Sequence, residues 1–388
     1  MKNINLLFIS LSLSLNSIAQ LSIPSILAQN PKLRPFVENA EKYKIQIIYT
    51  QIDRDSVGVP SFFTQTYRAD QEYFYPASLV KLPTSIIALE KLKALNIPSE
   101  CTYLTKKNEF CPREVLTDPT SPSGLPTIMH YIRKMALVSD NASFGRVWEM
   151  ISVDQLHLAL HSHGFRKTRI THRFDSGCAD KDRASTNPGI FFDKHGDTLY
   201  DISFRQADAQ WLTPIPNAKV GRANITGGKT IKAPRNFENM NYLPLEEVHE
   251  MLKCLLFPES YRPVQRFDMR EEDRKELIHC LTIPPRLGAI SNYQTTDYPD
   301  NLKKYLIYGD QPKAVLGDSI QITNIVGQSY GFLIDCAYIS DPAKGVEFFL
   351  SAVIYVNANE VINDGVYEYK SVGLPFLGEL GRTFYQID

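Results

Sequence analysis

Ser78 and Lys81 lie three positions apart within residues 75–83, YPASLVKLP. This stretch is typical of a turn from a strand into a helix, and helical residues at i and i+3 share a face. The lysine amine can take the serine proton and make the serine a nucleophile, provided that its surroundings lower its pKa. Backbone N–H groups at the start of the helix can stabilise the oxyanion that forms. The pair predicts acyl-transfer chemistry, although most S-x-x-K pairs are solvated helix starts.

A second polar motif, Ser139-Asp140-Asn141, follows further along the chain. Ser-x-x-Lys followed by Ser-Asp-Asn is the pattern of class A β-lactamases and penicillin-binding proteins. The sequence therefore resembles the serine β-lactamase and penicillin-binding-protein superfamily, and its pattern is most similar to the class A-like branch. The alternative for the second motif is a helix cap, because Ser, Asp and Asn are the preferred capping residues.

The resemblance implies a role for each motif residue. Ser78 would be the acylated nucleophile, and Lys81 the base that activates it directly or through water. Ser139 would relay a proton to the leaving nitrogen, and Asn141 would bind Lys81 or the substrate amide. Asp140 would be structural and hold the turn.

The third motif of the family, Lys-Ser/Thr-Gly on a strand beside the site, is only partly present. Ile325, Val326 and Gly327 occupy the corresponding positions, so the glycine is kept but the lysine and the hydroxyl residue are missing. The missing lysine would pair with a substrate carboxylate, and losing such a partner costs on the order of 2–3 kcal/mol of binding. We expect weaker recognition of a carboxylate at this site.

The residues after this position complete the expected site. By resemblance, the backbone N–H groups of Ser78 and Gln328 form the oxyanion hole. Gly327, Ser329 and Tyr330 are the expected substrate-binding residues. The resemblance implies no metal ion and no organic cofactor.

A further departure concerns deacylation. Class A enzymes place a glutamate in an irregular loop after the Ser-Asp-Asn helices, where it activates the hydrolytic water. Residues 164–175 resemble the start of that loop, but Phe174 or Asp175 falls where the glutamate would be. Asp175 is the candidate water-activating residue, with a shorter reach. The alternative is a loop aspartate that makes a turn contact.

The pattern along the chain predicts an α/β (α+β) fold, with an antiparallel sheet that both chain ends build and helices flank, plus an inserted all-helical lobe. β-Branched and aromatic runs predict strands near both ends, and apolar residues at helical spacing predict helices between them. Residues 30–85 and 300–388 would form the α/β lobe. Residues 86–299 would form the helical lobe, with a long irregular segment over 165–245. Strands are expected over 45–52, 61–67, 321–325, 332–339 and 346–356, and helices over 33–43, 152–164, 243–257, 270–281 and 374–385.

The N-terminus has the pattern of a secretory signal peptide. Lys2 precedes an apolar run over residues 4–15, and the small residues around Ala19 predict cleavage there, with a second, less well matched site after Ala28. Residues 1–19 would be the signal peptide, and the mature chain would be exported to the periplasm or the extracellular space. No later run reaches eighteen apolar residues, so no stable membrane span is expected.

Composition argues against nucleic acid as a partner but does not decide whether the cysteines form disulfides. The 388 residues carry a formal net charge of −1, which gives no electrostatic footprint for nucleic acid. The six cysteines follow no zinc-binding pattern. Export permits disulfides, and Cys101 with Cys111 or Cys254 with Cys280 are candidate pairs. Buried free thiols are the alternative.

These observations predict a secreted serine hydrolase that hydrolyses β-lactam amide bonds through an acyl-enzyme at Ser78. The substrate would be a small β-lactam or a cell-wall peptide. One alternative is a D-Ala-D-Ala peptidase similar to the penicillin-binding proteins, or an esterase. Another is a catalytically weakened binding protein, against which the retained Ser78, Lys81, Ser139 and Asn141 argue.

Overall fold

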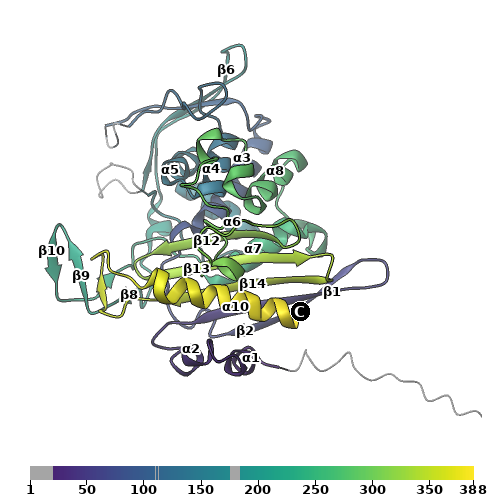
Figure 1. The fold of residues 1–388 in the computed structure, drawn as a ribbon. Coiled ribbons are helices and arrows are strands. Elements are labelled where there is room, and N and C mark those ends of the chain that lie inside the picture. The colour runs from purple at the N-terminus through teal and green to yellow at the C-terminus, as the bar shows by residue number, and fades with distance from the viewer. Residues whose placement is uncertain (1–20, 110, 112, 175–183) are drawn as a thin grey trace, which may run out of the picture.

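The computed structural model describes residues 21–109, 111, 113–174 and 184–388 (Figure 1). The predicted signal peptide over 1–19 lies outside these residues. Helix α1 (Ile23–Gln29) buries Ile23, Ile26 and Leu27 in the core. A cut after Ala28 would remove most of this helix, whereas a cut after Ala19 would leave it whole.

A five-stranded antiparallel sheet in the order β12-β13-β14-β1-β2 forms the centre of one lobe. The N-terminal strand β1 pairs with the C-terminal strand β14, as Ile48 opposite Ser351 illustrates. The predicted antiparallel sheet built from both chain ends is therefore confirmed. The strands are β1 (Gln46–Arg54), β2 (Pro60–Tyr67), β12 (Gln321–Ser329), β13 (Phe332–Asp341) and β14 (Val346–Tyr355).

Helices cover both faces of this sheet (Figure 1). Alternate side chains of a strand point to opposite faces, and in β14 Phe348 and Leu350 join one core cluster while Phe349 and Val353 join the other. The first cluster packs against α1, α2 (Arg34–Glu38), α9 (Tyr305–Tyr308) and α10 (Leu374–Ile387). The second lies under α7 (Leu245–Leu256) and continues into the helical lobe.

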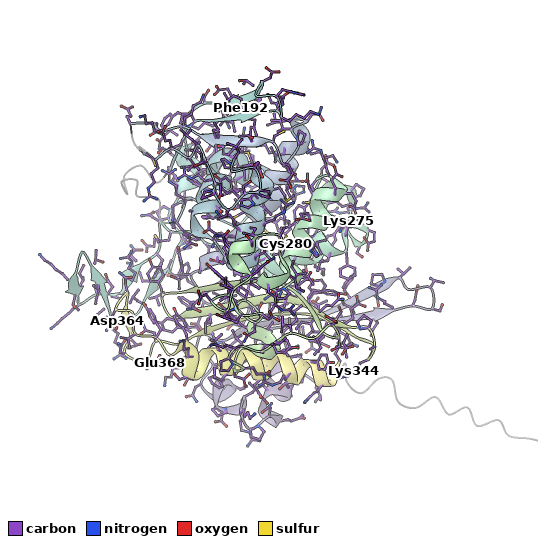
Figure 2. All side chains as sticks on the ribbon, turned by 45° about the horizontal axis from the view of Figure 1, so that its top comes forward. Phe192, Lys275, Cys280, Lys344, Asp364 and Glu368 are labelled. Carbon is purple, nitrogen blue, oxygen red and sulfur yellow. The ribbon has the colours of Figure 1, made fainter. Side chains whose placement is uncertain are left out.

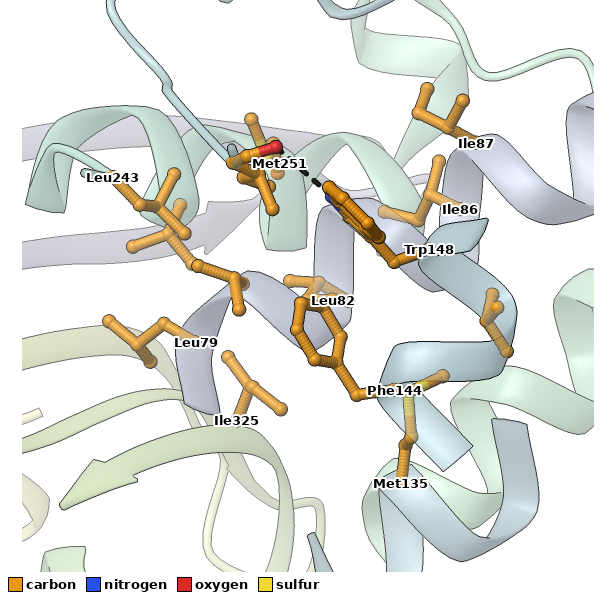
Figure 3. Packing of buried hydrophobic residues seen from close by; sticks show 14 of the residues in the cluster. Leu79, Leu82, Ile86, Ile87, Met135, Phe144, Trp148, Leu243, Met251 and Ile325 are labelled. Carbon is orange, nitrogen blue, oxygen red and sulfur yellow. Dashed lines mark hydrogen bonds between the residues drawn. The ribbon is translucent and has the colours of Figure 1, made fainter. Parts of the chain in front are cut away.

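The helical lobe packs around the long helix that follows Ser78. Figure 3 shows Phe144 and Trp148 of one helix facing Leu82 and Ile86 of another. The indole Nε1 of Trp148 donates to the carbonyl of Ile170 at 3.1 Å, so this polar group is satisfied in the core. The helices are α3 (Lys81–Ala94), α4 (Ile128–Val138), α5 (Asn141–Ile151), α6 (Val153–Ser162) and α8 (Glu271–Thr282).

The segment over 165–245, predicted as irregular, contains short strands, and the lobe predicted as all-helical holds a small sheet in the order β3-β5-β6. Each of these strands has two to five residues, too few to give a period-two pattern in the sequence. They are β3 (Thr102–Thr105), β4 (Ser185–Thr186), β5 (Gly189–Phe192), β6 (Thr198–Ile202), β7 (Arg205–Gln206), β8 (Lys219–Val220), β9 (Ala223–Thr226), β10 (Lys229–Ile231), β11 (Arg235–Asn236) and, near the C-terminus, β15 (Val361–Ile362).

Other helices match the predictions to within a few residues. Those expected over 243–257, 270–281 and 374–385 correspond to α7, α8 and α10. The helix expected over 33–43 is shorter, because Asn39 leaves helical geometry with φ −122° and ψ 30°. Single turns are η1 (Ala77–Val80), η3 (Ala209–Leu212), η4 (Pro258–Ser260), η5 (Pro263–Gln265), η6 (Pro285–Leu287), η7 (Ser291–Tyr293) and the π-helical η8 (Tyr369–Gly373).

Both candidate disulfide pairings are wrong. Cys111 is disulfide-bonded, but Cys101, Cys254 and Cys280 are free thiols, as is Cys336. Two of the free thiols come from different helices of the core, so sequence spacing could not indicate their surroundings. Within the described ranges, no helix is long and apolar enough to cross a membrane, and no cluster of three metal-ligating side chains occurs.

Candidate active site

Ser78 lies in the tight turn η1, directly before α3 begins at Lys81. The preceding Ala77 has φ 47°, a left-handed conformation that is uncommon for a residue with a side chain and that occurs often at functional sites. The turn packs against the edge of β12 so closely that a Cβ at Gly327 would lie 2.6 Å from the carbonyl oxygen of Pro76. Glycine at position 327 therefore lets the turn that carries Ser78 approach the sheet.

The side-chain nitrogen of Lys81 is the point on which the predicted catalytic residues converge. Its Nζ lies 2.9 Å from Ser78 Oγ, 2.9 Å from Ser139 Oγ and 2.8 Å from Asn141 Oδ1, and it also donates to the Ser139 carbonyl at 2.5 Å. An ammonium has three protons for these four oxygens. In the neutral amine, the Ser78 hydroxyl can instead donate to the nitrogen lone pair, which is the arrangement that proton abstraction requires.

The surroundings of Lys81 favour the neutral amine. The residue is 1% exposed, and burial lowers its pKa to about 7, with the charge of Lys303 acting in the same direction and that of Asp140 opposing it. The ring of Phe174 lies 5.7 Å from Nζ and packs on Phe144 at 4.7 Å, so an aromatic wall replaces water on that side. A lysine with a pKa near neutrality can serve as a general base.

The Ser139-Asp140-Asn141 motif has both of the properties weighed for it. Asp140 caps α5, because its Oδ1 accepts from the backbone N–H of Ser143 at 2.7 Å. Ser139 ends α4 in a left-handed conformation with φ 61° and ψ 39°. Asp140 thus provides the cap, while Ser139 and Asn141 turn toward Lys81.

The register of β12 and β13 orients the backbone of Gln328. A two-residue turn, with Tyr330 at φ 51° and Gly331 at φ 88°, joins the pair Ser329–Phe332. In an antiparallel ladder, hydrogen-bonded and non-hydrogen-bonded pairs alternate, and the pair that closes such a turn is hydrogen-bonded. The next pair, Gln328–Leu333, is therefore non-hydrogen-bonded. The N–H of Gln328 points away from β13, toward the free edge of β12 where η1 packs. This is the orientation that the expected oxyanion hole requires.

A cavity of about 280 Å³ opens at this position. Ser78, Asn141, Gln328, Ser329 and Tyr330 line it, whereas Gly327 packs behind it against η1. The remaining lining residues are Tyr75, Ala77, His172, Arg173, Phe174 and Met240.

His172, Arg173 and Met240 of this cavity wall were not predicted. A buried ion pair between Arg173 and Glu149 anchors the segment that carries His172 and Arg173, and Arg173 also donates to the Ser185 carbonyl at 3.2 Å. Glu149 is fully buried within α5. The sequence contained one indication of this ion pair, a glutamate among the apolar residues of a core helix. A buried carboxylate needs a partner, so a cation had to be expected beside it.

The position of the missing motif lysine is filled by core packing. Ile325 is 2% exposed and lies beside Leu79 in the cluster between sheet and helices, and Val326 is 4% exposed (Figure 3). Neither side chain lines the cavity. Asp175, the candidate deacylating residue, lies outside the described residues, whereas its neighbour Phe174 lies beside Lys81.

Comparisons with known proteins agree with this architecture. The model of the β-lactamase enzyme family matches residues 31–198, the part of the chain that contains both complete motifs. No curated protein matches the chain. A β-lactamase from Xanthomonas campestris pv. campestris is 13% identical with a TM-score of 0.50, over 94% of this chain and 98% of that chain. An ancestral class A β-lactamase is also 13% identical with a TM-score of 0.50, over 94% of this chain and all (100%) of that one. The chain is therefore similar to the β-lactamase enzyme family over residues 31–198, and it shares the fold of these β-lactamases over nearly its whole length.

Proposed function

We propose that this protein is an exported serine hydrolase that opens β-lactam amide bonds by forming an acyl-enzyme at Ser78. The observation that carries the proposal is the Lys81 nitrogen, which is buried, has a pKa of about 7 and lies 2.9 Å from Ser78 Oγ. A nucleophile and a base in hydrogen-bond contact are the minimal unit of covalent acyl transfer. The signal-peptide pattern of the N-terminus supports export.

We infer the following sequence of steps. Neutral Lys81 takes the proton of Ser78 Oγ, which attacks the carbonyl carbon of the substrate. The N–H groups of Ser78 and Gln328 stabilise the oxyanion. The C–N bond then breaks, and the proton passes from Lys81 through the Ser139 hydroxyl to the leaving nitrogen. Ser78 is left as an ester of the opened substrate.

A specific observation favours a second candidate, a penicillin-binding-protein-like peptidase in which the ester persists. Among the described lining residues of the cavity, none is Asp or Glu, and the ring of Phe174 lies 5.7 Å from the Lys81 nitrogen. We therefore propose that acylation is efficient and deacylation slow. Asp175 stays a predicted water-activating residue.

Intact mass spectrometry of the mature protein mixed with benzylpenicillin, sampled over time, tests both candidates. We expect one added penicillin mass that is absent in Ser78→Ala, and its lifetime separates a lactamase from a peptidase. Lys81→Met is the companion variant, in which Ser78 is kept and adduct formation should be strongly slowed. An equal adduct in wild type and Ser78→Ala, or none at millimolar penicillin, would refute the acyl-enzyme at Ser78.

A further inference from the structure

A second cavity, of about 220 Å³, lies next to the Ser78 cavity. Met240 lines both cavities, and the consecutive residues Thr171 and His172 line one each. The side chain of Met240 and the chain between Thr171 and His172 therefore form the wall that separates the two spaces. We call the second space the Ile215 cavity, after a residue that lines it and does not line the Ser78 cavity.

The backbone of this wall is held in place by Asn241, the neighbour of Met240. Asn241 is fully buried. Its Oδ1 accepts from the backbone N–H groups of Thr171 and His172 at 2.8 and 3.2 Å, and its Nδ2 donates to the His172 carbonyl at 3.0 Å. One amide side chain thus joins the two segments that meet at the wall.

A backbone contact strengthens the same junction. Arg169 and Tyr242 each donate their N–H to the carbonyl of the other, at 2.7 Å. Between these two residues the chain runs out to Phe192, at the end of the helical lobe far from the sheet, and returns (Figure 2). The wall is therefore a fixed tertiary contact between distant parts of the sequence.

The side chain of Met240 is the adaptable part of the wall. It is partly exposed, and methionine is unbranched with three rotatable bonds. It can therefore change its rotamer while the backbone that Asn241 holds stays in place. Neither cavity alone reaches the volume of about 300 Å³ at which pockets for drug-sized ligands begin. Joined past Met240, the two spaces exceed that volume.

The Ile215 cavity is suited to an apolar group. Leu212 and Ile215 give it apolar surface, and Arg169 and Glu238 are its charged residues among those described. Both charged side chains already have partners. Arg169 donates to two backbone carbonyls at 3.2 Å, and Glu238 accepts from Asn236 at 3.0 Å. Leu212 and Ile215 are then the groups that remain to receive a ligand.

We propose that the Ile215 cavity is a subsite for the apolar end of the substrate's acyl side chain, which reaches it past Met240. This inference rests on the function proposed above. The proposed relay puts the leaving nitrogen beside Ser139, which is not among the described lining residues of either cavity. The acyl side chain is thus the part of the substrate left to face Met240. The site then prefers elongated, unbranched apolar acyl groups to compact ones, and such contacts supply binding that the missing motif lysine cannot.

The test compares the rates at which two penicillins acylate Ser78, one with a heptyl and one with a methyl side chain. Each buried methylene is worth about fourfold in binding, so we expect the heptyl compound to react at least about thirtyfold faster in wild type. Ile215→Trp, which fills the subsite, should reduce this ratio to about threefold or less. Comparing the two rates within one variant cancels differences in the amount of folded protein.

Ile320→Trp is the matched control. Ile320 lines another cavity, of about 320 Å³, which shares no described lining residue with the Ile215 cavity or the Ser78 cavity. This variant should keep the wild-type ratio. A heptyl side chain that gives no advantage in wild type, or an equal ratio in wild type and Ile215→Trp, would overturn the proposal. If Ile215→Trp does not fold, Leu212→Trp fills the same cavity from η3 and takes its place.

A second measurement does not require acylation. Ser78→Ala is prepared with isotope-labelled isoleucine δ1 methyl groups, and the NMR resonance of Ile215 is identified by its loss in Ile215→Val. We expect the heptyl penicillin to shift this resonance and the methyl penicillin to leave it in place. An unshifted Ile215 resonance at millimolar heptyl penicillin would overturn the proposal. If neither penicillin acylates wild type, the proposed function fails, and the NMR result still decides whether the Ile215 cavity is a subsite.

Discussion

Replacing Phe174 by alanine should weaken the base at Ser78 by admitting water. Lys81 has a pKa of about 7 in place of 10.5, and the difference corresponds to on the order of 5 kcal/mol against the charged form. Burial is the largest cause, and the ring of Phe174 lies 5.7 Å from the nitrogen. The ring also attracts the ammonium through a cation–π contact, so the expected effect is a net one. A net relief of about 1 kcal/mol of the burial penalty raises the pKa of Lys81 by about 0.7 units.

The assay is the rate of penicillin labelling of Ser78 between pH 5.5 and 9. We expect the acidic limb of the Phe174→Ala profile to move upward, with labelling at pH 6 about fivefold slower than in wild type and little change at pH 9. The lifetime of the adduct should shorten, because the space left by the ring admits water next to Lys81.

Phe267→Ala is the matched control. Phe267 is also a half-buried phenylalanine with two aromatic partners, His163 and Phe165, and it does not line the Ser78 cavity. Its loss should cost similar packing without moving the pH profile. The reasoning would be refuted if Phe174→Ala changed the labelling rate by the same factor at every pH. Such a result would mean that the ring does not affect the protonation of Lys81.

Three further predictions follow from the same geometry. Because the pKa of Lys81 is lower in the folded than in the unfolded chain, unfolding takes up a proton between pH 7 and 10.5, and stability rises with pH in that window. The stability of Lys81→Met relative to wild type should therefore fall by about 2 kcal/mol from pH 7 to pH 9 in urea unfolding, and a constant difference would contradict this. Gly327→Ala, which puts a Cβ 2.6 Å from the Pro76 carbonyl, should cost about 1–3 kcal/mol and slow labelling, whereas Gly317→Ala, with open space around it, should change neither. Ser139→Gly, which tolerates the positive φ, should slow labelling about a hundredfold without loss of fold by circular dichroism, and a wild-type rate would exclude the proposed proton relay.

Local spacing accounts for the part of the site that sequence could predict. Ser78 and Lys81 lie at the start of one helix, and Ser139 to Asn141 form the junction between two helices. Residues so close in the sequence are also close in space, so their types and spacing were enough to predict that they belong to one site. The antiparallel sheet was predictable because its strands have eight to ten residues and clear β-branched runs.

Contacts between distant segments account for the part that sequence could not predict. Arg173 lies in an irregular segment and is anchored by Glu149 of α5, and Met240 reaches the same cavity wall from a segment far along the chain. No periodicity links such residues, and the identity of a buried partner is decided by the packing of whole elements. The short strands of residues 165–245 were missed for a related reason, since two to five residues carry too little pattern.

The replacement of the motif lysine by Ile325 leaves the contacts of Lys81 in place. Ile325 is buried beside Leu79 in the cluster between sheet and helices, and it does not line the Ser78 cavity. A lysine at this position would carry its charge into that apolar cluster, where an unpaired charge costs several kcal/mol. Lys81 Nζ keeps its contacts with Ser78, Ser139 and Asn141 without a lysine on β12. The loss of the motif lysine therefore does not imply the loss of the contact between Lys81 and Ser78, and the pH dependence of Ser78 labelling reports on that contact directly.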